Sequence, residues 1–238
     1  MNKIRELQAY IDKSRRIVFF GGAGVSTESG IPDFRSVDGL YSQKYKYPPE
    51  TIISHSFFAG RPGDFYDFYR DRVIRLDAKP NAAHLKLAEL ESAGKLSAVI
   101  TQNIDGLHQA AGSRIVLELH GSIWRNYCVK CGKPHKIEAI TGVSGVPTCD
   151  CGGVVRPDVV LYEESLDQGV LGQAEKYLRE ADLLIVGGTS LVVYPAAGLV
   201  SLSGAPLILI NKSATSQDPR ASLLIQDNIG DVLGRISI

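Results

Sequence analysis

Short runs of apolar residues recur along the chain and are separated by longer polar stretches. The runs are rich in β-branched residues and are bounded by Gly, Asn or Thr. Continuous apolar runs of this length predict strands that are covered on both faces, as in a parallel sheet. The runs are Ile17–Phe20, Leu96–Ile100, Val116–Leu119, Leu183–Val186 and Leu207–Ile210.

Stretches with the spacing of amphipathic helices lie between several of these runs. Asn81 to Ala93 places its leucines among charged residues, and Leu171 to Ala181 directly precedes the fourth run. The N-terminal stretch MNKIRELQAYIDKSRR also predicts an amphipathic helix. Strands that alternate with helices indicate a doubly wound, Rossmann-like α/β fold with a parallel sheet.

Two segments interrupt this alternation. The first is dense in Tyr and Phe, so we expect a small helical layer that packs on itself, and the second holds all four cysteines. A chain of 238 residues is long enough for one large domain with a smaller module inserted in it. We expect a single domain over 1–238, with a Rossmann-like core from about 1–32, 80–126 and 156–238 and a small module from about 33–79 and 127–155.

The cysteines fall in two close pairs, Cys128 with Cys131 and Cys149 with Cys151. Glycines at 132, 152 and 153 supply turns that let the backbone wrap around an ion. The pattern predicts a zinc ribbon whose four thiolates leave no position for a reacting water. Disulfides are the alternative, and a pair separated by one residue is badly placed to form one. A redox role for the first pair is a further alternative.

The first apolar run leads into GGAGVSTESGIPDFR, residues 21–35. Its early glycines let the chain turn sharply after a strand, which predicts N–H groups and a helix N-terminus facing an anion such as pyrophosphate. Thr27 stands where the Rossmann fingerprint has its third glycine, so the turn departs from that pattern. Phe34 suits a flat ring and Arg35 suits a phosphate. These features together predict a dinucleotide site.

Polar residues also follow two of the other predicted strands. TQNIDGLH follows the second run and His120 the third. Because the carboxyl ends of parallel strands share one sheet edge, we expect these residues to line one crevice. An imidazole suits proton transfer near neutral pH, so His120 is the candidate general base. The alternative for His120, and our expectation for the other four histidines, is a structural role.

These motifs, in this order from Ile17 to about Asp231, resemble the sirtuins, a family of NAD-dependent protein deacylases. The resemblance implies an NAD-dependent protein-lysine deacetylase, which transfers the acetyl group of acetyl-lysine to ADP-ribose and releases nicotinamide and O-acetyl-ADP-ribose. NAD is then the co-substrate, one zinc ion is structural, and acetylated-lysine proteins or peptides are the partners. The resemblance implies that His120 and Asn103 are catalytic, with His120 taking a proton from a ribose hydroxyl.

The resemblance also implies which residues bind cofactor and peptide. The cofactor residues are Gly22, Ala23, Gly24, Thr27, Asp33, Phe34, Arg35, Gln102, Asn103, Ile104, Asp105, Gly188, Thr189, Ser190, Asn211 and Asp231. An extended substrate backbone is expected to pair with segments that hold Val159, Val160, Leu161, Val192 and Val193. Beside this groove Glu163 replaces a glycine that is common in the family.

Some sirtuins hold negatively charged acyl chains with a Tyr and an Arg three residues apart. Tyr69 and Arg72 have that spacing here. Alignment on Phe65 and Tyr66 instead sets Tyr66 against Tyr69, with Arg70 one position late. We favour this second register, which implies plain acetyl-lysine.

Composition narrows the classes of function. The 26 basic and 26 acidic residues cancel, so no polyanion-binding or membrane-adhesive surface is indicated. No apolar run approaches the roughly 20 residues of a membrane span, and the N-terminus lacks the pattern of a signal peptide. We therefore expect a cytoplasmic protein without a direct nucleic-acid partner, and the oligomeric state stays open.

Three other functions share parts of this pattern. A protein mono-ADP-ribosyltransferase would share nicotinamide cleavage but end on a side-chain nucleophile, and His120 with two peptide-pairing segments favours deacylation. A non-catalytic NAD-binding sensor would bind the cofactor without turnover. A hydride-transferring dehydrogenase is suggested by the fold alone, and the missing third glycine and the Phe34-Arg35 loop argue against it.

Overall fold

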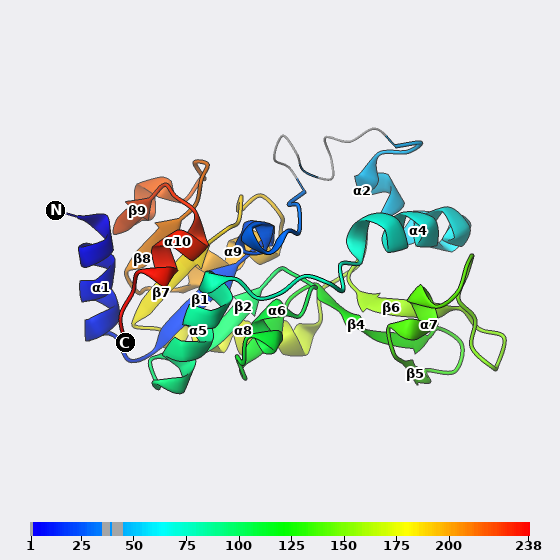
Figure 1. The fold of residues 1–238 in the computed structure, drawn as a ribbon, viewed down its shortest axis with the longest axis horizontal. Helices are drawn as coiled ribbons and strands as arrows, with labels where there is room; N and C mark the ends of the chain where they lie inside the picture. The colour runs from blue at the N-terminus through cyan, green and yellow to red at the C-terminus, as the bar shows by residue number, and fades with distance from the viewer. Residues whose placement is uncertain (1, 35–38, 40–44) are drawn as a thin grey trace.

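A parallel sheet of six strands forms the centre of the larger part of the molecule in the computed structural model, which describes residues 2–34, 39 and 45–238 (Figure 1). The strand order is β3-β2-β1-β7-β8-β9, so the chain reaches one edge, returns to the middle and then builds the other half. This is the Rossmann order. The strands are β1 (Ile17–Gly21), β2 (Leu96–Thr101), β3 (Val116–Glu118), β7 (Leu183–Gly187), β8 (Leu207–Ile210) and β9 (Leu223–Ile225).

The doubly wound α/β class expected from the sequence is confirmed. All five apolar runs form strands of this sheet, with bounds that differ from the predicted ones by one residue at most. The sixth strand, β9, was not predicted. It has only three residues, too few to show a pattern of its own, and it forms by pairing with β8.

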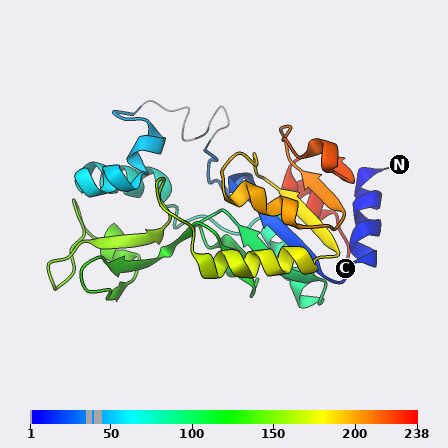
Figure 2. The same ribbon diagram turned by 180° about the vertical axis from the view of Figure 1, so that it is seen from behind.

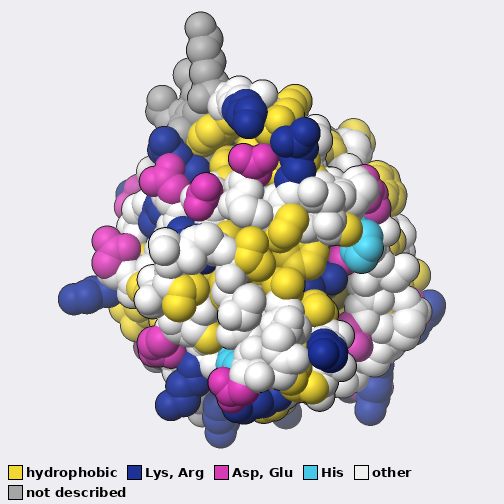
Figure 3. All heavy atoms as spheres, turned by 90° about the vertical axis from the view of Figure 1, so that its right-hand side faces the viewer, with side chains coloured by type: hydrophobic (Ala, Val, Ile, Leu, Met, Phe, Trp, Pro, Cys, Tyr) yellow, Lys and Arg dark blue, Asp and Glu magenta, His cyan; other side chains and the backbone are white. Residues whose placement is uncertain are grey.

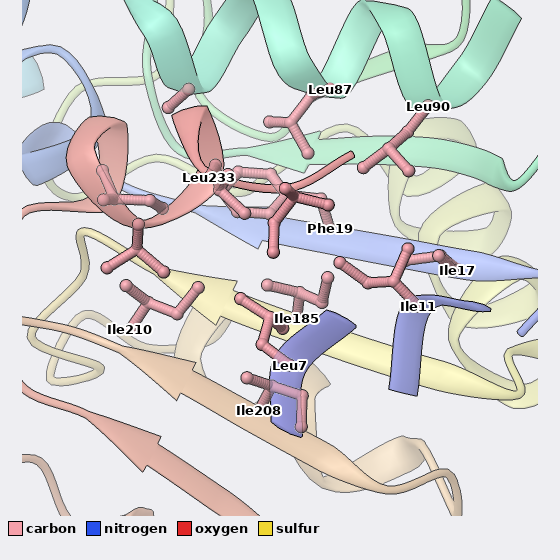
Figure 4. Close-up of a cluster of buried hydrophobic side chains, with 14 of the residues drawn as sticks. Leu7, Ile11, Ile17, Phe19, Leu87, Leu90, Ile185, Ile208, Ile210 and Leu233 are labelled. Atoms are coloured by element: carbon pink, nitrogen blue, oxygen red, sulfur yellow. The ribbon is translucent and has the colours of Figure 1, made fainter. Parts of the chain in front are cut away.

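Helices cover both faces of the sheet (Figures 1 and 2). One face is covered by α1 (Lys3–Lys13), α5 (Ala82–Ser92) and α10 (Ile229–Gly234), and the other by α8 (Gln168–Glu180) and α9 (Ala196–Leu199). Successive strand residues point to opposite faces. Ile17 and Phe19 of β1 therefore join the first core, shown in Figure 4, whereas Val18 and Phe20 join the second.

A smaller body, which we call the small module, lies at the other end of the molecule and is seen end-on in Figure 3. A helical layer there packs on an antiparallel sheet with the order β5-β4-β6. Its elements are α2 (Pro49–Ile52), α3 (His55–Gly60), α4 (Pro62–Phe68), a π-helical turn (Tyr69–Val73), β4 (Gly121–Cys128), β5 (Pro134–His135), α7 (Glu138–Thr141) and β6 (Val155–Val159).

The helical layer and the antiparallel sheet share one hydrophobic core. Phe65, Tyr66 and Tyr69 from the helices pack with Ile123 and Val155 from the strands. The Tyr66 hydroxyl also donates to the carbonyl of Val155 at 2.5 Å. The aromatic segment and the cysteine segment therefore fold against each other, although the helix α5 and strands β2 and β3 lie between them in the sequence.

Short helical elements complete the fold, and most of them stand at strand ends. They are η1 (Ala23–Val25), η2 (Thr27–Ser29), α6 (Leu107–Ala110), η5 (Val200–Leu202) and η6 (Asp218–Arg220). Among the described residues, no helix combines the length and the apolar character that a membrane crossing requires.

Candidate active site

The glycine turn after β1 packs directly against the loop after β7. The Gly24 N–H donates to the carbonyl of Gly188 at 2.8 Å, and a Cβ on Gly24 would lie 2.8 Å from the Cα of Gly188. A Cβ on Gly22 would lie equally close, 2.8 Å, to the Cβ of Thr189. The glycines are therefore required for the contact between the two loops, in addition to any role toward a ligand.

The expectation of an α-helix N-terminus at this turn is wrong. Residues 23–25 and 27–29 form two short 3-10 turns instead. Gly30, with a φ of 83°, ends the second turn in the left-handed conformation, so no longer helix follows. The Thr27 hydroxyl donates back to the carbonyl of Gly24 at 3.0 Å, which holds the two turns together.

Three polar side chains form a network beside the glycine turn. The Ser26 hydroxyl donates to Oδ2 of Asp105 at 2.7 Å, and the Asn103 amide donates to the Ser26 oxygen at 3.0 Å. Oδ1 of Asp105 accepts from the N–H of Leu107, the first residue of α6, at 2.9 Å. Sequence reasoning missed Ser26, whose only signal was its place inside the glycine motif. Its 1% exposure shows that it is an internal part of the site.

A second set of hydrogen bonds joins the ends of β2, β7 and β8. The Gln102 amide donates to the Thr189 hydroxyl at 3.0 Å. The Asn211 side chain accepts from the Thr189 N–H at 3.0 Å and donates to the Thr189 carbonyl at 2.9 Å. Asn211 therefore fixes the backbone of the loop after β7, which the sequence did not indicate.

His120 stands one residue beyond Leu119, whose N–H extends the pairing of β3 with β2. Its Nδ1 lies 2.9 Å from the carbonyl of Gln102. Because a carbonyl only accepts, Nδ1 carries the proton and Nε2 has a free lone pair. Burial lowers the pKa of His120 below 6.5, and the bond to Gln102 partly opposes that effect. The imidazole is therefore neutral at neutral pH and able to accept a proton at Nε2.

The first predicted peptide segment runs directly past His120. Val159 is the last residue of β6 and pairs with Gly121, and the Val160 N–H donates to the carbonyl of His120 at 3.0 Å. The Leu161 N–H donates to the Glu164 carboxylate at 2.9 Å. Much of this segment's hydrogen-bonding capacity is thus already used within the chain, while it stays next to the imidazole.

The second predicted peptide segment lies in the loop after β7, where Val192 is 56% exposed. Leu191, just before it, has a φ of 53°, and Glu163, just after the first segment, has a φ of 74°. These are the two non-glycine residues with positive φ in the described part of the chain. Left-handed backbone is costly for such residues and is concentrated at functional sites. Both outliers flank the predicted groove.

The remaining predicted cofactor residues lie at several places in the structure. Ile104 packs on the core of the small module, while Asp33 and Phe34 are partly exposed. Asp231 is exposed on α10, where its carboxylate accepts from the Asn228 amide at 3.2 Å. Ala23 is in η1 and Ser190 is exposed after β7, whereas Arg35 lies outside the described residues.

The aromatic residues considered for acyl selectivity lie in the core of the small module. Tyr66 and Tyr69 are 0% and 1% exposed. Arg72 forms an ion pair with Asp71 at 2.5 Å, and the Arg70 Nε donates to the carbonyl of Ile140 at 2.8 Å.

The four cysteine sulfur atoms form one cluster, in which all lie within 4.8 Å of one another. The Sγ atoms of Cys128 and Cys151 are 3.5 Å apart, and those of Cys131 and Cys149 are 3.8 Å apart. All four cysteines are free, which is contrary to the disulfide alternative. Tetrahedral thiolates with Zn–S bonds of about 2.3 Å stand roughly 3.8 Å apart, so the cluster fits a structural zinc ion.

The ribbon is built closely around this cluster. A Cβ on Gly153 would lie 2.6 Å from the Cys128 sulfur, so only glycine fits there. The Lys130 N–H points at the same sulfur, 3.4 Å away. Four protein ligands close a tetrahedral shell, which gives such an ion a role in folding and none in the reaction.

Comparisons with known proteins agree with these features. The Sir2 family model matches residues 22–195. A protein named NAD-dependent protein deacetylase from Clostridium acetobutylicum is 59% identical over 98% of this chain and 97% of its own length. A protein of the same name from Clostridium perfringens is 55% identical over 99% of this chain and 98% of its own.

Solved structures are similar over nearly the whole chain. A complex described as Sir2 with p53 peptide and NAD+ has a TM-score of 0.87 at 41% identity, covering 98% of this chain and 96% of that one. Sir2 bound to acetylated peptide has a TM-score of 0.88 at 40% identity, with the same coverage of 98% and 96%. From the family model, the full-length relatives and the common fold together, we conclude that this chain belongs to the Sir2 family.

Proposed function

We propose that this chain is an NAD-dependent protein-lysine deacetylase, which transfers the acetyl group of acetyl-lysine to ADP-ribose and releases nicotinamide and O-acetyl-ADP-ribose. The observation that carries the proposal is the 2.9 Å hydrogen bond between Nδ1 of His120 and the carbonyl of Gln102. It fixes the tautomer in which Nε2 is a base, at the sheet edge where Asn103, Asp105 and Thr189 also lie.

The residues at this edge fit NAD. The glycine turn and the loop after β7 provide a close backbone approach with N–H and hydroxyl donors, which suit a pyrophosphate and ribose hydroxyls. Bound NAD supplies ADP-ribose as the acetyl acceptor and nicotinamide as the leaving group. We assign its binding to Gly22, Ala23, Gly24, Thr27, Asp33, Phe34, Arg35, Gln102, Asn103, Ile104, Asp105, Gly188, Thr189, Ser190, Asn211 and Asp231.

His120 and Asn103 are the proposed catalytic residues. His120 takes a proton at Nε2, and the lowered pKa keeps it in the basic form at neutral pH. Asn103 is 9% exposed and is held by Ser26, so its amide is preorganised rather than free to rotate. Preorganised polar groups stabilise charge that develops in a reaction without first having to reorient.

We propose that the peptide binds between Val159–Leu161 and Val192–Val193 by strand addition, with the acetyl-lysine directed toward His120. The hydrogen bond from the Val160 N–H to the His120 carbonyl holds the first of these segments beside the imidazole. Plain acetyl is the proposed acyl group, because Tyr66 and Tyr69 are buried and Arg72 is paired with Asp71. The Tyr66 hydroxyl is already engaged with the carbonyl of Val155.

The remaining expectations follow from the same picture. We propose that the Rossmann-like core (about 1–32, 80–126 and 156–238) and the small module (about 33–79 and 127–155) form one catalytic domain. We also propose a cytoplasmic location, with acetylated-lysine proteins as partners. The balanced charge supports the absence of a direct nucleic-acid partner.

The test is to incubate the protein with NAD and an acetyl-lysine peptide and to follow both products by mass spectrometry. We expect deacetylated peptide and O-acetyl-ADP-ribose in equal amounts. ADP-ribosylated protein would instead indicate the transferase, and NAD binding without nicotinamide release would indicate the sensor. Turnover of NAD to NADH with a candidate substrate would indicate a dehydrogenase.

Two variants of His120 separate its position from its basicity. His120→Ala removes both the base and the bond to Gln102. His120→Asn retains an amide N–H that can donate to the Gln102 carbonyl but has no base at the Nε2 position. Both variants should lose deacetylation while retaining zinc, measured by atomic emission. Deacetylation by either variant at the wild-type rate would refute the assigned role.

A further inference from the structure

Trp124, the single tryptophan of the chain, lies on β4 at a place where the strand pairing is irregular. The register between β4 and β6 shifts between Ser122 and Asn126, and the Trp124 side chain is 46% exposed. Its indole N–H donates to the main-chain carbonyl of Asp105 at 2.8 Å. A large, half-exposed apolar side chain is thus attached to a loop of the proposed cofactor site.

The loop is shaped to receive the indole. Gly106 has a φ of 75°, and a Cβ there would lie 2.7 Å from Nε1 and 2.8 Å from Cδ1 of Trp124. No side chain fits between the loop and the ring. The N–H of Ile123 donates to the carbonyl of Ile104 at 3.0 Å, so β4 holds two successive carbonyls of the loop.

Asp105, whose main-chain carbonyl accepts from Trp124, also contributes its carboxylate to the polar network beside the glycine turn. The Asp105 carboxylate accepts from Ser26 at 2.7 Å, and Ser26 in turn accepts from Asn103 at 3.0 Å. The direction of the Asp105 side chain depends on its backbone, and that backbone is fixed where Trp124 binds its carbonyl.

We propose that Trp124 is a positioning residue for the part of the cofactor site formed by Asn103 and Asp105. The inference rests on the proposed function, since it assigns those residues to NAD. Its indole N–H keeps the Asp105 peptide unit in one orientation and thereby keeps the carboxylate on Ser26. Loss of one neutral hydrogen bond of this kind should weaken NAD binding about three- to tenfold. Peptide binding should be unaffected.

The indole also provides an optical signal for the site. A hollow of about 350 Å³ lies beside it and is lined by Gly106, Gln109, Glu118, Ser122, Trp124 and Arg125. The ring and Gly106 of the Asp105 loop line this hollow together, so the indole emission responds to changes around its hydrogen-bond partner. Because the chain has one tryptophan, all indole emission comes from this position.

The first experiment is a titration of the wild-type protein with NAD, followed by tryptophan emission and by calorimetry. N-acetyl-tryptophanamide at the same absorbance corrects for filtering and collisional quenching. We expect a saturable change in emission with the same midpoint as the heat of binding. Saturation of the heat without any change in emission would overturn the proposal, and so would a failure to bind NAD at all.

The second experiment replaces the indole N–H alone. Expression with 3-benzothienylalanine exchanges N–H for sulfur at Trp124 and nowhere else, because no other tryptophan is present. We expect three- to tenfold weaker NAD binding by calorimetry, with unchanged acetyl-lysine peptide binding and a Tm lowered by no more than roughly 6 °C, because one hydrogen bond of the folded protein is lost. Leu85→Ala, which truncates a side chain that is 55% exposed on α5, is the control and should change none of these.

Unaltered NAD binding after the exchange would overturn the positioning role. Parallel losses of NAD binding, peptide binding and Tm would also overturn it, because they would mark a merely structural residue. These readouts are independent of turnover. A wild-type protein that binds NAD without deacetylating the peptide refutes the proposed function and still decides the role of Trp124.

Discussion

Replacing Asn211 with alanine should destabilise the protein and weaken its proposed cofactor site together. Asn211 is 6% exposed and follows β8 directly. Its side chain makes both hydrogen bonds to the Thr189 backbone, accepting from the N–H at 3.0 Å and donating to the carbonyl at 2.9 Å. Alanine removes both partners, and the site is too enclosed for water to replace them freely.

The expected magnitude follows from those two buried groups. A buried polar group left without a partner costs about 1–3 kcal/mol, so the pair should cost about 2–6 kcal/mol. For a chain of this size each kcal/mol lowers Tm by roughly 2–4 °C, which gives a loss of roughly 4–24 °C. Asn211→Asp has the same shape but turns a carboxylate oxygen toward the Thr189 carbonyl, so at pH 7 it should destabilise at least as much.

Urea unfolding followed by circular dichroism measures the stability, and calorimetry with NAD measures the site. Ser201→Ala is the control, because it removes an exposed hydroxyl that donates to the Gly198 carbonyl at 2.6 Å, and it should change stability by less than about 0.5 kcal/mol. If Asn211→Ala unfolds within 0.5 kcal/mol of the wild type, or if it is destabilised yet binds NAD with wild-type affinity, the inferred link between Asn211 and the loop after β7 is wrong.

Three further predictions concern protonation and the zinc site. Because burial lowers the pKa of His120, the acidic limb of kcat/KM for the peptide should lie below pH 6.5, and a limb above that value would contradict the assignment. Burial also lowers the pKa of His108 to about 3, and neither ring nitrogen has a partner among residues 2–34, 39 and 45–238. The folded state therefore resists protonation of His108 while the unfolded state accepts it, so the free energy of unfolding decreases as pH falls below 6.5. His108→Phe should reduce that loss between pH 6 and 4 by about 1.4 kcal/mol per pH unit, measured by urea unfolding. An unchanged dependence of the free energy of unfolding on pH would refute this prediction. Cys149→Ser should lose bound zinc by atomic emission and lower Tm, because this cysteine also lies in the small module's core; retention of one equivalent of zinc would contradict the four-thiolate site.

The sequence by itself determined the class of the fold and most of the proposed site. The apolar runs could be predicted as strands because a parallel strand covered on both faces requires a continuous run of apolar side chains. Such a run is visible in a few consecutive residues of the sequence. The cysteine pairs are also readable, since ligand spacing within each pair is set by the geometry of one tight turn. Positions at strand ends could be grouped because parallel strands present their carboxyl ends at one edge.

Backbone detail at the site was decided by tertiary contacts. The glycine turn carries 3-10 turns rather than an α-helix start, because Gly30 ends it and Gly24 packs on Gly188. Strand β9 has only three residues and exists because it pairs with β8. The left-handed φ values of Glu163 and Leu191 had no signal in residue type, since both are residues that normally avoid that region.

The partners of the polar residues were likewise beyond the sequence. Ser26 bonds to Asp105 across 79 positions, Trp124 reaches the Asp105 carbonyl from another strand, and Asn211 holds Thr189 from a neighbouring one. Residue type and local spacing indicate which hydrogen bonds or reactions a side chain is capable of. Which atom it meets depends on how distant strands and loops are brought together, and that is fixed only when the sheet and the small module have packed.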